Sequence, residues 1–270
     1  LDLDFQQKEC YTIGDLEHII ALLRAPGGCP WDIEQTHQSV RANLIEETYE
    51  AVEAIDTNNM ELLKEELGDV LMQVLFHAQM EAEQGTFTFA DVVDGVAKKL
   101  IVRHPHVFGN VQVTDSSQVL SNWDEIKKKT KSQTTQTEVL ESVSVALPAL
   151  MRSYKVQKKA AKVGVDVSDA NAALDQIIAR AQELKQTLSK QQDSNLLEHQ
   201  VGDLLFSAVN VARKCEVEPE YSLTNACNRF IIYFTAVEKY TQEKQLCWSD
   251  LTPQELNSIW QRVTTEQFSQ

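Results

Sequence analysis

The sequence predicts an all-α protein, and two observations carry this prediction. Glycine (9) and proline (6) make up 15 of the 270 residues, about half of the usual share of about 12%. An all-β sandwich or barrel needs turn residues every few positions, so this composition disfavours it. Apolar residues also recur at the spacing of one helix face, as in Leu16, Ile19, Ile20 and Leu23.

Helix ends follow from capping and breaking residues. Gly85 is a good C-cap after a long periodic segment, and Pro105 disfavours helix at the residue before it. A loop is expected at residues 25–32, the most Gly/Pro-dense stretch. Helices are expected at residues 13–23, 39–56, 60–84, 88–102, 116–129, 147–163, 170–189, 195–214, 222–243 and 253–265.

The helices fall into two related halves. Residues 66–72 (ELGDVLM) resemble residues 200–206 (QVGDLLF), 134 positions later. A repeat this long indicates domain duplication and not a solenoid. The polar stretch at 131–145, rich in Thr and Gln at its start, is predicted to be a linker. The sequence therefore predicts domains at 1–130 and 146–270.

Composition excludes several classes of protein. The net charge of −15 disfavours binding to nucleic-acid polymers by bulk electrostatics. No apolar run approaches the roughly 18 residues that a transmembrane helix needs. Five cysteines without a CxxC pair disfavour a disulfide framework and a zinc knuckle. Without a signal peptide, the expected location is the reducing cytoplasm. The absence of an initiator Met leaves open that the chain is a fragment of a longer fusion.

Two short acidic patterns mark the candidate site. Glu46 and Glu47 precede Glu50 by four and by three residues, and Glu66 precedes Asp69 by three. Residues at this spacing share a helix face, about 5–6 Å apart at Cβ. Two antiparallel helices joined by a short turn would bring both sets together. Oxygen ligands so placed suit Mg²⁺, and the lack of sulfur or imidazole ligands disfavours Zn²⁺.

Two alternatives to this metal site stay open. One is a solvated acidic face, since EExxE strings are common on surface helices. Gly68 argues against it, because a mid-helix glycine costs about 1 kcal/mol relative to alanine and suggests close approach of a backbone or a ligand. The other is a di-iron bundle, which needs a Glu-x-x-His on each of two helices. Only Glu34 and His37 have that spacing.

Several motifs together resemble one family. They are EExxE at 46–50, ExxD at 66–69, GCPWDxxQT at 28–36, RHPHVF at 103–108 and LPALMR at 147–152. With these motifs the chain resembles the MazG-type nucleoside triphosphate pyrophosphohydrolases of the two-domain form, from about residue 16 to residue 260.

The resemblance implies fold, activity and metal ligands. It implies tandem MazG-like helical bundles in a homodimer, which hydrolyse NTPs or dNTPs to the monophosphate and pyrophosphate by water attack at the α-phosphorus. Such an enzyme would remove surplus or non-standard nucleotides from the nucleotide pool. The cofactor would be Mg²⁺, with Mn²⁺ as a substitute. The metal would be held by Glu47, Glu50, Glu66 and Asp69, while Glu46 ligates it or orients the attacking water and Glu47 shares the catalytic role.

Substrate-binding candidates come from the neighbouring segments. Arg103 is the preferred phosphate clamp, since a guanidinium makes bidentate contacts, and Lys64 and Lys99 are further cations. For each of these three residues, the alternative is that it lies on the protein surface without contacting the substrate. Trp31 is expected either to stack on a base or to pack in a core or an interface. His104 is expected to be structural, as is His106.

The second half departs from the family pattern. The EExxE positions fall on Ala179, Arg180 and Glu183, and the ExxD positions fall on Gln200 and Asp203. Two acids beside an arginine make a poor Mg²⁺ site. The second half is therefore expected to be a degenerate structural or dimerising domain. The alternative for the whole chain is a non-catalytic nucleotide-sensing or scaffolding protein with a vestigial site.

Overall fold

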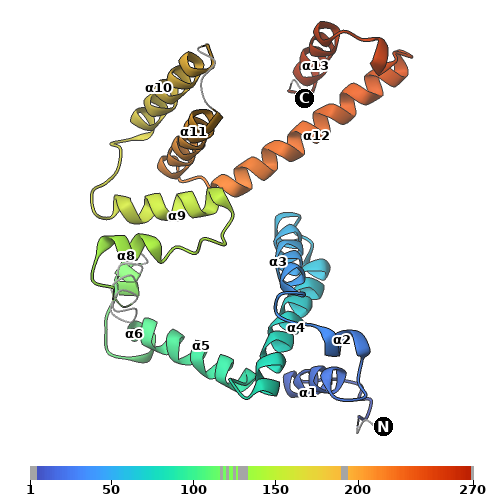
Figure 1. The fold of residues 1–270 in the computed structure, drawn as a ribbon, viewed down its shortest axis with the longest axis vertical. Helices are drawn as coiled ribbons and strands as arrows, with labels where there is room; N and C mark the ends of the chain where they lie inside the picture. Colours follow the sequence, from blue (N-terminus) through green and yellow to red (C-terminus); the bar gives the residue numbers. More distant parts are fainter. Residues whose placement is uncertain are drawn as a thin grey trace. The chain divides into compact units, whose positions relative to one another are not determined.

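The computed structural model describes residues 5–115, 118–119, 122–123, 126, 133–189 and 194–268. These residues form helices and connecting turns, and no strand occurs among them, so the predicted all-α class is confirmed. The chain divides into two compact units, residues 1–129 and 130–270 (Figure 1). None of the described helices combines the length and the apolar character needed to cross a membrane.

The first unit contains a long helical hairpin with shorter helices beside it. α1 packs against α4 and α2, and α3 packs along α4. The described helices are α1 (Ile13–Arg24), α2 (Pro30–Glu34), α3 (Arg41–Asp56), α4 (Met60–Gln84), α5 (Phe89–Arg103) and α6 (Pro105–Phe108).

Local capping explains where these helices begin and end. The Thr12 hydroxyl accepts a hydrogen bond from the Asp15 amide, and the Asp15 carboxylate accepts one from the Thr12 amide. Thr88 and Asp91 cap α5 in the same way. Gly85 ends α4 in the left-handed region, at φ 74°, as its residue type predicts.

The core of the first unit lies between α1 and α4. Ile20, Val40, Leu75, Phe76 and Met80 form one buried cluster, which covers the C-terminal half of α4. The N-terminal half of α4 packs against α3 instead. Polar residues can therefore face α3 there without entering this cluster.

The Arg24 side chain contacts both α2 and this core. Its guanidinium lies 5.1 Å from the centre of the Phe76 ring and donates to the Asp32 carbonyl at 2.5 Å and to both Glu83 carboxylate oxygens at 2.9 Å. The turn before α2 is equally constrained, because a Cβ on Gly28 would lie 2.3 Å from the Leu22 carbonyl oxygen. These contacts fix the position of Trp31 in α2.

The second unit repeats the helical hairpin. α10 packs along α11 as α3 packs along α4, and α9 contacts α11 and α12. The described elements are α8 (Gln136–Glu141), α9 (Ala149–Ala161), α10 (Ala170–Ser189), α11 (Ser194–Lys214), α12 (Pro219–Glu243), η1 (Trp248–Asp250) and α13 (Pro253–Phe268).

Within the described residues, the structure adds four short helical elements that the sequence did not predict, α2, α6, α8 and η1. Helix α2 begins inside the predicted loop, where Pro30 is the first helical residue, a position that proline favours. Helix α8 lies inside the predicted linker, begins with a Thr135–Glu138 capping box and buries Val139. Most of the helix expected at 116–129 lies outside the described residues.

Candidate active site

The α3–α4 hairpin brings the two acidic patterns together. Helix α3 ends at Asp56 and α4 begins at Met60, so only three residues connect two antiparallel helices. Asn58 takes the left-handed conformation in this turn, at φ 53°, which asparagine tolerates better than most residues. The hairpin therefore places the carboxylates of α3 opposite those of α4.

The facing residues follow one another along the hairpin. Glu50 lies close enough to Glu66 to raise the pKa of its carboxyl. Further along, Glu47 approaches Glu66 and Asp69, and one ligand oxygen from each of these three residues lies within 4.8 Å of the others. Asn43 and Gln73 come next, on the wall of a pocket that also reaches Glu47.

Burial and mutual repulsion raise the pKa of two of these acids. Glu66 is only 8% exposed, and burial raises its pKa, with Glu50 and Asp69 adding to the effect. Burial also raises the pKa of Glu47, followed by repulsion from Asp69 and Glu50. Both carboxylates are thus poorly stabilised as anions by their surroundings.

A cation would relieve this repulsion, and the described residues do not supply one. In the described part of the chain, no lysine or arginine forms an ion pair with Glu47, Glu66 or Asp69. Converging carboxylate oxygens are the ligands of hard divalent cations. The residues present therefore fit a metal ion of this class.

The two other predicted acids lie at the margin of this group. Glu46 is exposed on α3, next to Glu47, and lies outside the three-carboxylate group. Glu50 is also exposed, but it lies close enough to Glu66 to raise the pKa of that carboxyl. The structure thus brings Glu47, Glu66 and Asp69 closest together.

The predicted cationic residues are not joined to the acids. Lys64 is exposed on the first part of α4. Lys99 and Arg103 lie on α5, which packs against α4 and α6. Within the described residues, no hydrogen bond or ion pair connects these three side chains to the carboxylate group. Their role in substrate binding stays a prediction.

Gly68 does not mark a close approach within the chain. A Cβ added at this position would meet no atom within 4 Å. The expectation that another part of the backbone packs against this glycine is therefore wrong. The space in front of Gly68 is open to a ligand or to another molecule.

Two histidines form a polar pair that the sequence analysis did not anticipate. The rings of His37 and His77 stack, with centroids 5.0 Å apart, and their Nδ1 atoms are 2.7 Å apart. The other ring nitrogen of His37 lies 2.6 Å from a Glu81 carboxylate oxygen. His37 thus contributes to packing between α4 and the segment before α3.

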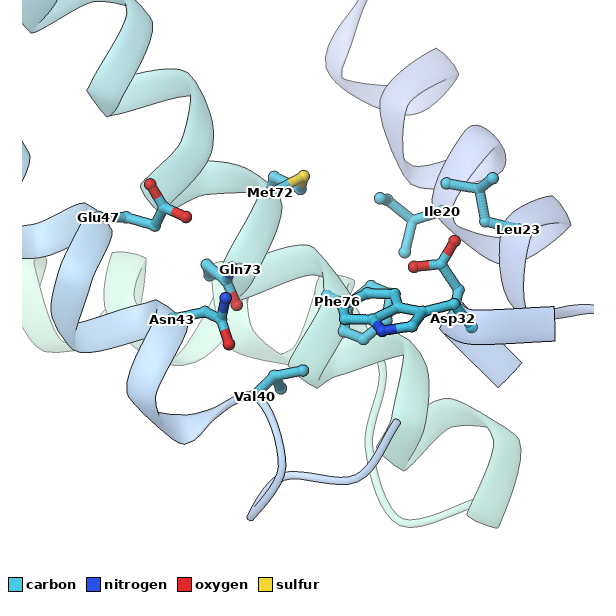
Figure 2. A pocket seen from close by; sticks show the side chains of 10 residues that line it. Ile20, Leu23, Asp32, Val40, Asn43, Glu47, Met72, Gln73 and Phe76 are labelled. Carbon is cyan, nitrogen blue, oxygen red and sulfur yellow. The ribbon is translucent and has the colours of Figure 1, made fainter. Parts of the chain in front are cut away.

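A pocket of about 150 Å³ begins beside the carboxylate group. Glu47 contributes to its wall, together with the exposed Trp31. Figure 2 shows Glu47, Asn43 and Gln73 towards one side of the view and Ile20 and Leu23 towards the other. The remaining lining residues are Asp32, Val40, Met72 and Phe76. Trp31 thus lines this pocket, and its stacking on a base stays a prediction.

The sequence analysis missed the two amides of this pocket. Asn43 precedes Glu47 by four residues, and Gln73 follows Asp69 by four. That spacing places each amide on the helix face of its neighbouring acid. Extending the acidic pattern by one helical turn in each direction would have found both residues.

The second unit has an arginine at the corresponding place. Arg180 on α10 lies 3.1 Å from a Glu183 oxygen and 3.8 Å from an Asp203 oxygen on α11. Its single positive charge offsets part of the repulsion between the two remaining acids. In the described part of the second unit, no group of three metal-ligating side chains converges.

Comparisons with known proteins agree with this geometry. The family model of the MazG nucleotide pyrophosphohydrolase domain matches residues 35–108, which include the entire α3–α4 hairpin. The nucleoside triphosphate pyrophosphohydrolase/pyrophosphatase MazG of Thermotoga maritima is 39% identical over 92% of this chain and 94% of its own length. The chain belongs to the MazG pyrophosphohydrolase family.

Two further relatives show how much of each chain the similarity covers. The nucleoside triphosphate pyrophosphohydrolase of Escherichia coli K12 is 37% identical over 93% of this chain and 96% of its own length. The uncharacterized protein YabN of Bacillus subtilis is 43% identical over 90% of this chain. The chain spans 49% of the length of YabN, so this MazG-family chain corresponds to about half of that relative.

Proposed function

We propose that this MazG-family chain hydrolyses nucleoside triphosphates to the monophosphate and pyrophosphate, with Mg²⁺ at the carboxylate group of the first unit. The observation that supports the proposal is the convergence of Glu47, Glu66 and Asp69 within 4.8 Å without a cationic partner from the described chain. A triphosphate is a polyanion, and this acidic hairpin would repel it unless a divalent cation lay between them.

When bound, Mg²⁺ would neutralise charge on the phosphate oxygens and draw the triphosphate to the hairpin. Glu47, Glu66 and Asp69 would hold it, and Glu50, whose charge raises the pKa of Glu66, would complete the set. Mn²⁺ has similar ligand preferences and would be expected to substitute.

The chain's own contribution to the chemistry is a carboxylate that takes a proton. The oxygen of a water molecule attacks the α-phosphorus, and the bond from this phosphorus to the bridging oxygen breaks. Pyrophosphate leaves with the bonding electrons. Glu46, exposed beside Glu47, would accept the proton of the attacking water. Clearance of surplus or non-standard nucleotides and assembly as a homodimer are further parts of this proposal.

A direct assay tests the proposal. The purified protein is incubated with a panel of NTPs and dNTPs, with Mg²⁺ or with EDTA, and pyrophosphate and nucleoside monophosphate are measured. Both products are expected in equal amounts with Mg²⁺ and neither with EDTA. Equal release of nucleoside diphosphate and phosphate would instead place the attack at the γ-phosphorus.

Matched variants link the activity to the carboxylate group. Glu47→Gln is expected to abolish pyrophosphate release, since Glu47 lies inside the converging group. Glu53→Gln, an exposed position on the same helix, is expected to retain it. A protein that releases no pyrophosphate from any substrate would favour the non-catalytic sensing or scaffolding alternative.

A further inference from the structure

The pocket beside the carboxylate group contains one buried polar group without a partner. Gln73 is 6% exposed, and its Oε1 atom is buried without a hydrogen-bond partner. A buried acceptor left unsatisfied costs about 1–3 kcal/mol. An amide kept at that cost in the wall of a pocket (Figure 2) suggests a ligand that donates a hydrogen bond to it.

The surroundings of Gln73 restrict the kind of ligand. Ile20, Val40, Met72 and Phe76 give the pocket an apolar wall, and Trp31 adds an exposed indole at its edge. A flat, largely apolar ring with polar atoms along one edge fits such a lining. Because Glu47 belongs both to the pocket and to the carboxylate group, this ring would be attached to the phosphates held there.

We propose that this pocket holds a pyrimidine base and that Gln73 is a specificity-determining residue, whose amide accepts a hydrogen bond from an N–H on the edge of that base. The inference rests on the proposed function and names the substrate class of the same site. The N–H would be the 4-amino group of cytosine or N3–H of uracil and thymine. Asn43 offers a second amide on the facing helix.

The chemistry of an amide supports this pairing in either orientation. Gln73 carries an acceptor and a donor side by side. Cytosine presents a donor at N4 next to an acceptor at N3, and uracil presents N3–H next to O4. One rotation of the amide complements the first base, and the opposite rotation complements the second.

The size of the pocket favours a single ring over a purine. Its volume is about 150 Å³, close to that of an engineered apolar cavity that binds benzene. A six-membered ring fills such a space, whereas the second ring of a purine would extend out of it. A base that loses apolar contact because one of its rings lies outside the pocket is expected to have a kcat/KM lower by about 10-fold or more.

Substrate analogues test the inference on the unaltered chain. We expect kcat/KM for CTP and UTP to exceed that for ATP and GTP by about 10-fold or more. We also expect CTP to exceed its analogue with a pyrimidin-2-one base, which lacks the 4-amino group, by about 10- to 100-fold. This second ratio depends on one N–H and not on the size of the base.

A pair of matched variants assigns the ratio to Gln73. Gln73→Leu removes the amide at similar volume and is expected to bring the ratio of CTP to its pyrimidin-2-one analogue close to 1, chiefly through KM. Gln84→Leu makes the same change at an exposed position at the end of α4 and is expected to keep the wild-type ratio. Thermal melting of both variants checks that they fold.

The outcomes separate this inference from the proposed function. Pyrophosphate release without preference for pyrimidines, or a CTP ratio that Gln73→Leu leaves unchanged, overturns the inference while the enzymatic proposal stands. If no triphosphate is hydrolysed, calorimetry with Mg²⁺ and α,β-methylene-CTP decides. A Kd that rises about 10-fold in Gln73→Leu supports the inference. An unchanged Kd, or no binding to the wild-type protein, overturns it.

Discussion

The two helical hairpins of this chain solve the same electrostatic problem in different ways. In the α3–α4 hairpin, Glu47, Glu66 and Asp69 converge and their charges have no partner in the described chain. In the α10–α11 hairpin, Arg180 lies beside Glu183 and Asp203. In the proposed function the first hairpin takes a cation from solution, whereas the second places an arginine beside its two acids. Three changes between the related hairpins accompany this difference: the positions of Glu46, Glu47 and Glu66 are occupied by Ala179, Arg180 and Gln200.

The largest expected effect comes from removing a carboxylate in one hairpin but not in the other. Loss of partners outside the ligand shell costs about 10- to 100-fold in metal affinity or activity, so loss of a ligand should cost about 100-fold or more. Asp69→Asn should therefore reduce kcat/KM for pyrophosphate release by at least that factor. Asp203→Asn, the corresponding change in α11, should leave it within a factor of about two.

A folded Asp203→Asn variant that releases no pyrophosphate, together with an active Asp69→Asn variant, would reverse the assignment of the two hairpins. Circular dichroism and thermal melting of both variants show whether a loss of activity is a loss of fold.

The next effect is on stability in the presence of Mg²⁺. A ligand that binds only the folded state raises the free energy of unfolding by about 2.7 kcal/mol at 100 times its Kd. Mg²⁺ should therefore raise the midpoint of urea unfolding of the wild-type chain. The increase should disappear in Glu47→Gln and persist in Glu183→Gln. An increase that survives in Glu47→Gln would place the bound cation elsewhere.

The metal-free protein should show a pH dependence that comes from the first hairpin. The pKa of Glu47 and of Glu66 is raised above the ordinary value of 4.5. The folded state therefore binds more protons than the unfolded state above pH 4.5, and the free energy of unfolding falls as pH rises through the raised pKa. Urea unfolding in EDTA between pH 4.5 and 7.5 should show this fall.

Removing one of the two acids should flatten this pH dependence. Glu47→Gln should reduce the slope and stabilise the metal-free protein at pH 7, because it removes repulsion from Asp69 and Glu66. The same type of change in α10, Glu183→Gln at the position that corresponds to Glu50, should keep the wild-type slope. A slope that Glu47→Gln leaves unaltered would mean that other groups cause it.

The smallest effect is expected from the arginine of the second hairpin. The Arg180 and Asp203 side chains are 46% and 60% exposed, and exposed ion pairs contribute about 0–1 kcal/mol. Arg180→Ala should therefore lower the free energy of unfolding by less than about 1 kcal/mol and leave pyrophosphate release unchanged. Arg213→Ala is a useful contrast, since the largely buried Arg213 pairs with Asp166. A loss from Arg180→Ala as large as that from Arg213→Ala would show that Arg180 does more than balance charge.

Local sequence signals predicted most of the helices because their causes are local. The capping residues Thr88 and Gly85 act within one helical turn. Helix α4 was predicted over the same range, 60–84, as the structure shows. Helix α8 was missed because its polar composition resembles that of a linker, although the Thr135–Glu138 capping box was present in the sequence.

The acids of the candidate site were predicted, again because the signal lies within single helices. Spacing along one helix shows that Glu47 and Glu50 share a face, and that Glu66 and Asp69 share another. It cannot show how deeply a side chain is buried. Gln73 resembles any other polar helix residue until the helices pack and bury its side chain in the wall of the pocket.

The sequence by itself thus determined the family, the all-α class and the identity of the acidic residues, because these depend on residue types and on spacing within single helices. Only the tertiary structure decided which acids converge, that Arg180 lies between acids of two helices, and that an unpartnered amide faces a pocket beside Glu47. These properties depend on the register between helices, which is set by apolar packing and by the three-residue turn between α3 and α4.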